Sequence, residues 1–148
     1  MTRKSLGRGQ AAVEFALISV IALMVLLLGI QFAMIGQAAL AVSQASDAIA
    51  RYASINAGQL PANGSVTVNS TIKQLVSSSL LTNGGNDLTI TIASYSGNTT
   101  STTSSPIQGD RAVLSISYNA ASKILLPNPF LGISFPSSLT ANQVSLYE

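Results

Sequence analysis

From Arg8 to Ile35 the chain reads RGQAAVEFALISVIALMVLLLGIQFAMI. The part from Ala11 onward is almost wholly apolar, and Glu14 carries its only charge. About 20 apolar residues suffice to cross a bilayer as a helix. No charged side chain follows Glu14 until Asp47. The pattern therefore predicts a membrane-spanning helix with one carboxylate at its N-terminal edge, where an unpaired charge is costly.

Composition supports a membrane-associated protein. The 148 residues leave room for a membrane segment and one small soluble domain. Only 8% of residues are charged, and the mean hydropathy is +0.45. The net charge of +2 is concentrated at the start, because three of the seven basic residues precede Gly9. The remaining four basic residues face five acidic ones, so we expect no nucleic-acid partner.

The chain has neither cysteine nor histidine. Without them the usual ligands of zinc, iron and copper are missing, and no disulfide can form. The commonest general base is also missing, which excludes a Ser-His-Asp arrangement. We therefore predict no enzyme activity, no catalytic residue, no cofactor and no metal site.

The first nine residues are polar and basic, as in a targeting leader. A secretory signal peptide would have a shorter apolar region before a small-residue cleavage site, which Ala38, Ala39 and Ala41 imitate. The longer run favours a retained helix over this alternative. Basic residues before the span place the N-terminus in the cytoplasm. We expect a single-pass cytoplasmic (inner) membrane protein with its C-terminal domain outside, and later a cell-surface or pilus location.

The helical pattern continues beyond the apolar run and becomes amphipathic. One face either covers the chain's own soluble domain or forms a seam between subunits, and the small alanines permit close approach. Asn56, Gly58 and Pro61 predict its end. A helix from Gln10 to Ile55 is about 70 Å long, more than twice the bilayer core. The face repeats every seven residues and comprises Ile35, Ala38, Val42, Ala45, Ile49 and Tyr52.

We divide the chain into a leader (1–9), a long helix (10–56) and a small α+β domain (57–148). The helix is transmembrane over about 11–35 and projects over 36–56. In the domain, a short helix around Ile72 to Leu80 is predicted, with Asn63 or Ser65 as N-cap. Alternating apolar residues predict an antiparallel sheet of about three strands, the last and shortest at Val144 and Leu146. The Ser/Thr-rich stretch 94–105 is expected to be an exposed loop.

The segment Arg8-Gly9-Gln10-Ala11-Ala12-Val13-Glu14-Phe15-Ala16-Leu17, followed by an apolar helix, resembles the TadE-like family of tight-adherence (Flp-type, type IV-like) pilus systems. Members of this family are minor pilins or pseudopilins. A weaker resemblance extends along the helix tail, from Gln37 to Ala53, and to the C-terminal half. It rests there on Val113 to Tyr118, Leu139-Thr140-Ala141 and Glu148.

The resemblance implies that a prepilin peptidase cuts between Gly9 and Gln10, where a residue without a side chain leaves room for an active site. Glu14 would then receive the α-ammonium of a neighbouring subunit, and Phe15 would pack against neighbouring helices. The implied partners are the peptidase, other pilin subunits, the assembly platform and the membrane. Gln10 as a new N-terminus is able to cyclise to pyroglutamate, which would remove that ammonium.

Other interpretations remain open at this point. A single-pass surface or adhesion module that forms no filament predicts an uncut N-terminus and a dispensable Glu14. If Glu14 only complements a helix N-terminus, its charge contributes about 0.3–1 kcal/mol. Within the filament class, a major pilin and a secretion-type pseudopilin are alternatives, although Flp-type major subunits are generally much shorter and nearly all helix.

Overall fold

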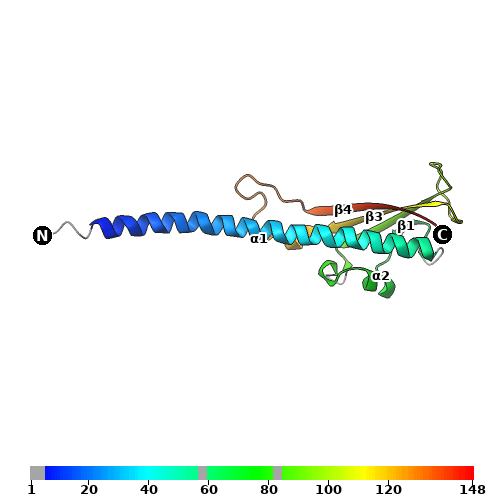
Figure 1. The fold of residues 1–148 in the computed structure, drawn as a ribbon, viewed down its shortest axis with the longest axis horizontal. Helices are drawn as coiled ribbons and strands as arrows, with labels where there is room; N and C mark the ends of the chain where they lie inside the picture. Colours follow the sequence, from blue (N-terminus) through cyan, green and yellow to red (C-terminus); the bar gives the residue numbers. More distant parts are fainter. Residues whose placement is uncertain (1–5, 57–59, 82–84) are drawn as a thin grey trace.

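The structure is a computed structural model that describes residues 6–56, 60–81 and 85–148. One long helix, α1 (Leu6–Ile55), runs the length of the molecule, and a small domain packs along its C-terminal part (Figure 1). Met1 to Ser5 of the predicted leader, and Gly58 of the predicted helix stop, lie outside the described residues. The helix ends at Ile55 as predicted but begins at Leu6, four residues before Gln10.

The sheet has four antiparallel strands in the order β1-β2-β3-β4, one more than predicted. They are β1 (Asn63–Val66), β2 (Leu88–Tyr95), β3 (Arg111–Asn119) and β4 (Ser138–Leu146). The extra strand β1 has the sequence NGSV and buries only Val66. Its pattern shows no apolar alternation, so pairing with β2 rather than local propensity determines it.

The short helix is shorter than predicted and has a different cap. It consists of α2 (Ser70–Leu75) and a separate 3-10 turn, η1 (Ser78–Leu80). Asn69 is the N-cap of α2, because its Oδ1 accepts a hydrogen bond from the Ile72 amide at 3.0 Å. The proposal of Asn63 or Ser65 as N-cap was wrong, because both residues lie in β1.

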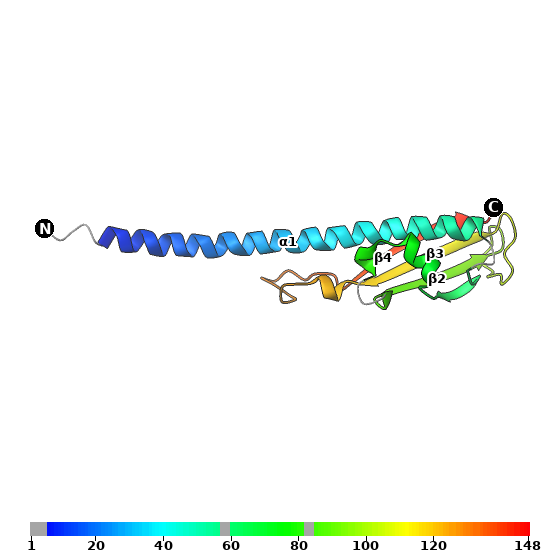
Figure 2. The same cartoon turned by 90° about the horizontal axis from the view of Figure 1, so that it is seen from below.

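The last strand is nine residues long rather than short, and the face that carries Val144 and Leu146 is the exposed one. Val144 and Leu146 are 54% and 61% exposed, whereas Leu139, Ala141 and Gln143 alternate with exposed positions and are half-buried. In the register, Ala141 lies opposite Ile116, which is fully buried. Helix α1 packs against β3 and β4, so this face of β4 is the covered one (Figure 2).

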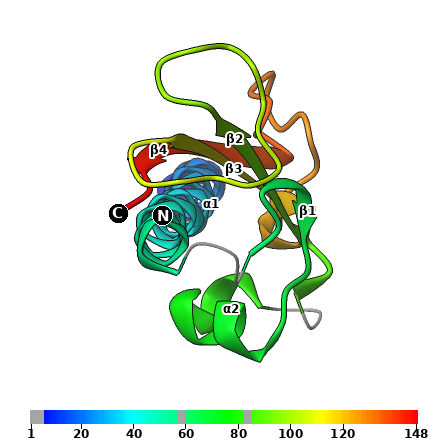
Figure 3. The same cartoon turned by 90° about the vertical axis from the view of Figure 1, so that its right-hand side faces the viewer.

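The core lies between α1, one face of the sheet, and the α2–η1 segment (Figure 3). Ile49 of α1 and Ile90 and Ile116 of the sheet are fully buried in it, as are Ile72 and Leu80. The amphipathic face of the helix covers this domain, as one of the two interpretations held. Its buried members are Ile35, Ala38, Val42, Ala45 and Ile49, and Tyr52 is half-buried.

The far end of α1 is tied to the C-terminus. Ser94 is fully buried, and its hydroxyl donates to the Ala62 carbonyl at 2.7 Å. The Tyr147 hydroxyl, 2.8 Å away, therefore donates to Ser94 Oγ, and the Glu148 amide donates to the Ser54 carbonyl of α1.

The exposed loop predicted over residues 94–105 begins only after Tyr95, because Ser94 and Tyr95 belong to β2. Asp110 holds that loop by accepting hydrogen bonds from the amides of Gly97 and Ile107.

Candidate membrane and assembly segment

The N-terminal part of α1 lies outside the domain. From Gly9 to Ile30 every side chain except the half-buried Leu28 is exposed, and burial begins at Gln31. By length and composition α1 is a candidate membrane span, and its most apolar window has a mean hydropathy of 2.7 with no residue buried. We call residues 9–30 of α1 the bare segment. At 1.5 Å per residue it is about 33 Å long, close to the thickness of a bilayer core.

The four residues predicted for processing and assembly all lie on this bare helix. Gly9 and Gln10 are in its first turns, and a side-chain carbon added at Gly9 would meet nothing within 4 Å. Glu14 and Phe15 are exposed, Phe15 by 73%. Gln10 and Glu14 stand four residues apart, so they are neighbours on one helix face. Among the side chains that the structure describes, none forms a hydrogen bond or an ion pair with the Glu14 carboxylate.

Gln31 marks the point where the bare helix meets the domain, a role that the sequence analysis did not assign. Its side chain is fully buried. Its Nε2 donates to the Lys123 carbonyl at 3.0 Å, and its Oε1 accepts from the Leu125 amide at 2.8 Å. Beside it Phe32 contacts Phe135 edge to face, with ring centroids 5.6 Å apart. The available signal was a polar amide inside an apolar run, which is costly in a membrane unless it is bonded.

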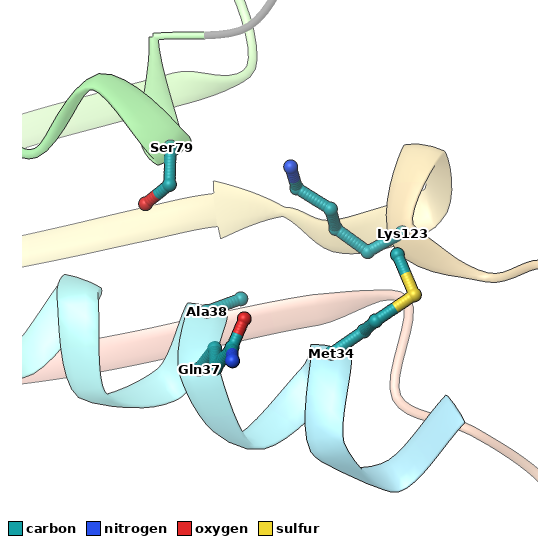
Figure 4. A pocket seen from close by; sticks show the side chains of 5 residues that line it. All are labelled: Met34, Gln37, Ala38, Ser79 and Lys123. Carbon is teal, nitrogen blue, oxygen red and sulfur yellow. The ribbon is translucent and has the colours of Figure 1, made fainter. Parts of the chain in front are cut away.

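A small cavity of about 110 Å³ lies between α1, η1 and the 3-10 turn η3 (Ala120–Lys123). In Figure 4, Met34 and Lys123 stand at one end of it, and the Lys123 chain extends towards the side of Ser79. The remaining lining residues are Gln37 and Ala38. Its lining has one cation and no carboxylate, so it offers no acid–base pair.

The sequence also contains a Ser-x-x-Lys spacing, Ser70 to Lys73, of a kind that places a nucleophile near a base in some acylating enzymes. Both residues are exposed on the six-residue helix α2, and neither lines a described cavity. Over the described residues no three acidic, histidine or cysteine side chains come together as a metal site would require. These positions therefore give no chemical site that competes with the bare helix.

The fold and the bare segment define a class: proteins with one apolar N-terminal helix that continues into a small α+β domain. Residues 9–51 match the family model of the TadE-like proteins, which confirms the resemblance predicted from the motif around Glu14. The match ends within α1, so the resemblance of the C-terminal strands stays a prediction. Searches of curated proteins and of solved structures found no match.

Proposed function

We propose that this protein is a structural subunit, a minor pilin or pseudopilin, of a type IV-like tight-adherence pilus or a related secretion apparatus. The observation that carries the proposal is the TadE-like match over a bare apolar helix that holds Glu14 near its start. The sheet domain packs beside the C-terminal half of this helix and leaves the N-terminal half uncovered (Figure 2). Exposed apolar helix of this length needs lipid before assembly and neighbouring helices after it.

Processing is the first step of the proposed function. A prepilin peptidase at the cytoplasmic face removes residues 1–9 by cutting the Gly9–Gln10 bond. That bond lies near the N-terminal end of α1, which begins at Leu6, so unwinding the helix there breaks only its first few hydrogen bonds. The open space around Gly9 leaves the backbone accessible to an enzyme.

Assembly is the second step. Glu14 sits at the membrane edge without a described partner, and the α-ammonium of a neighbouring subunit would neutralise it. A charge pair is tolerable in a medium of low dielectric, whereas a lone buried charge is not. The domain then projects outward. The two hydrogen bonds between the Gln31 side chain and the backbone at Lys123 and Leu125, which we call the Gln31 clamp, hold it against the helix.

Cleavage in membranes that contain an active prepilin peptidase tests this function. Wild type is expected to lose residues 1–9. We expect Gly9→Val to lower the initial cleavage rate about tenfold or more, equivalent to ~1.4 kcal/mol in the barrier, because a branched side chain crowds the scissile bond. The matched control is Gly29→Val, the same change in open space on the same helix, which should be cut at the wild-type rate.

A wild-type chain left intact by a peptidase that cleaves a known prepilin in the same membranes would contradict the proposal. That result would favour the alternative of an anchored surface or adhesion module that forms no filament.

A further inference from the structure

Beyond the proposed function, one segment of the domain has a composition unlike that of a soluble loop. After Lys123 no charged residue occurs until Glu148, and the first part of this run reads ILLPNPFLGISFP, from Ile124 to Pro136. We call these residues the apolar loop. Its side chains include Leu125 at 66%, Leu131 at 63% and Ile133 at 39% exposed. Large apolar groups exposed together mark a surface that contacts another apolar phase.

The position of the apolar loop identifies that phase. The clamp from Gln31 to the backbone at Lys123 and Leu125, together with the Phe32–Phe135 contact, holds the loop beside the helix at the end of the bare segment. Figure 1 shows the loop reaching back along α1 towards the N-terminus, away from the sheet. A bilayer filled by the bare segment would have its outer boundary at the level of this loop.

Several backbone polar groups of the apolar loop are hydrogen-bonded within the loop itself. Asn128 Nδ2 donates to the Phe135 carbonyl, and Asn128 Oδ1 accepts from the Phe135 amide, each at 3.0 Å. Phe130 and Ile133 exchange two amide–carbonyl bonds of 2.9 and 2.8 Å. Because unpaired backbone groups are the main cost of entering lipid, these internal bonds lower that cost.

The tip of the apolar loop presents a leucine under conformational strain. Leu131 has φ of 50°, and Gly132 has φ of 79°. Two successive residues of positive φ between a bonded pair form a tight hairpin turn, where Asn or Gly is the usual first residue. A large apolar residue is unfavourable at this position unless contacts of its side chain offset the backbone strain.

From these observations we propose that the apolar loop inserts into the outer interfacial layer of the same bilayer that α1 spans, as a second membrane contact that fixes the depth of the domain. The inference rests on the proposed membrane insertion of α1. An apolar surface seated at the boundary of headgroups and acyl chains binds by the area it buries. Lys123, at the base of the loop, would lie at the level of the lipid phosphates.

Site-directed spin labels on the full chain test this proposal. The chain has no cysteine, so single substitutions label cleanly. Leu125→Cys and Leu131→Cys are labelled in vesicles of phosphatidylcholine and phosphatidylglycerol at a low protein-to-lipid ratio. Collision rates with oxygen and with a water-soluble nickel chelate then report depth. The controls are Leu23→Cys in the span and Val144→Cys on the outward face of β4, which are 57% and 54% exposed.

We expect both loop labels to show a severalfold higher ratio of oxygen to nickel collisions than the label at position 144. If the loop labels show the same collision ratio as the label at position 144, the proposal is overturned. If the label at position 23 is lipid-like in the same experiment, the membrane insertion of α1 still stands. A water-like collision ratio at position 23 would overturn both the loop proposal and the membrane insertion of α1. Protection of the loop that appears only at high protein density would identify a second copy of the chain as the occupant, and would also overturn it.

A second variant tests whether Gln31 positions the apolar loop. Gln31→Ala removes the hydrogen bond to the Lys123 carbonyl at the base of the loop and the one from the Leu125 amide within it. Combined with Leu125→Cys, it should move that label towards the aqueous signal, while a label at position 23 stays in lipid. An unchanged depth at position 125 would contradict the role of Gln31 in positioning the loop.

Discussion

Glu14→Ala is expected to leave processing intact and to exclude the subunit from filaments. The carboxylate is exposed on a bare helix, and the described residues provide no partner for it. In the proposed pairing, its removal would leave a neighbour's α-ammonium buried and unpaired, at a cost of roughly 3–5 kcal/mol. That cost corresponds to a loss of about two to four orders of magnitude in incorporation. The measurement is the amount of variant in sheared filaments relative to processed variant in the membrane.

Two further variants separate charge from packing. Glu14→Gln keeps the shape of the side chain without its charge and should fail as Glu14→Ala does. Val13→Ala, at an adjacent position that is 69% exposed, should be incorporated nearly as wild type is. Normal filament content in both Glu14 variants would show that this charge only complements the helix N-terminus.

Ile116→Ala is expected to destabilise the domain by about 2–5 kcal/mol. Ile116 is fully buried on β3, between Ile90 of β2 and Ala141 of β4 in the register. The loss leaves a cavity in a small core that has no disulfide to support it. Because a domain of this size has only about 5–15 kcal/mol of stability, the change is a large fraction of it.

Urea unfolding in mild detergent, followed by tyrosine fluorescence, measures this effect. The matched control is Val144→Ala on the neighbouring strand, which is 54% exposed and should change the free energy of unfolding by about 0.5 kcal/mol or less. Equal effects of the two substitutions would contradict the assignment of inner and outer sheet faces.

The parts of this fold that follow periodic patterns were predictable from sequence. The long helix and its end at Ile55 follow from an apolar run that continues as a seven-residue repeat. Strands β2 and β3 follow from alternation on one face, as at Ile90 and Ile116. Strand β1 was missed because Gly64 and Ser65 carry no apolar signal, and its pairing is tertiary.

The sequence pattern of β4 does not reveal which of its faces is covered. Alternation identifies two faces, but it does not say which one is covered, and Val144 and Leu146 are the more apolar set. Helix α1 lies close over this edge of the sheet, so the covered face carries smaller or polar residues such as Ala141 and Ser145. For the candidate site, the sequence placed Gln10, Glu14 and Phe15 on one helix and Gly9 at the end of the leader, whereas the structure includes Gly9 in the helix. The sequence did not reveal the Gln31 clamp, whose partners lie 92 and 94 residues away.

We propose that this chain is processed and assembled as a pilin-like subunit. The most direct test is the mass of the N-terminal peptide of the protein recovered from sheared surface filaments. We predict a chain that begins at Gln10 with a basic α-amine. An intact Met1 or a start near residue 40 would contradict the claim, and pyroglutamate at position 10 would contradict the pairing with Glu14.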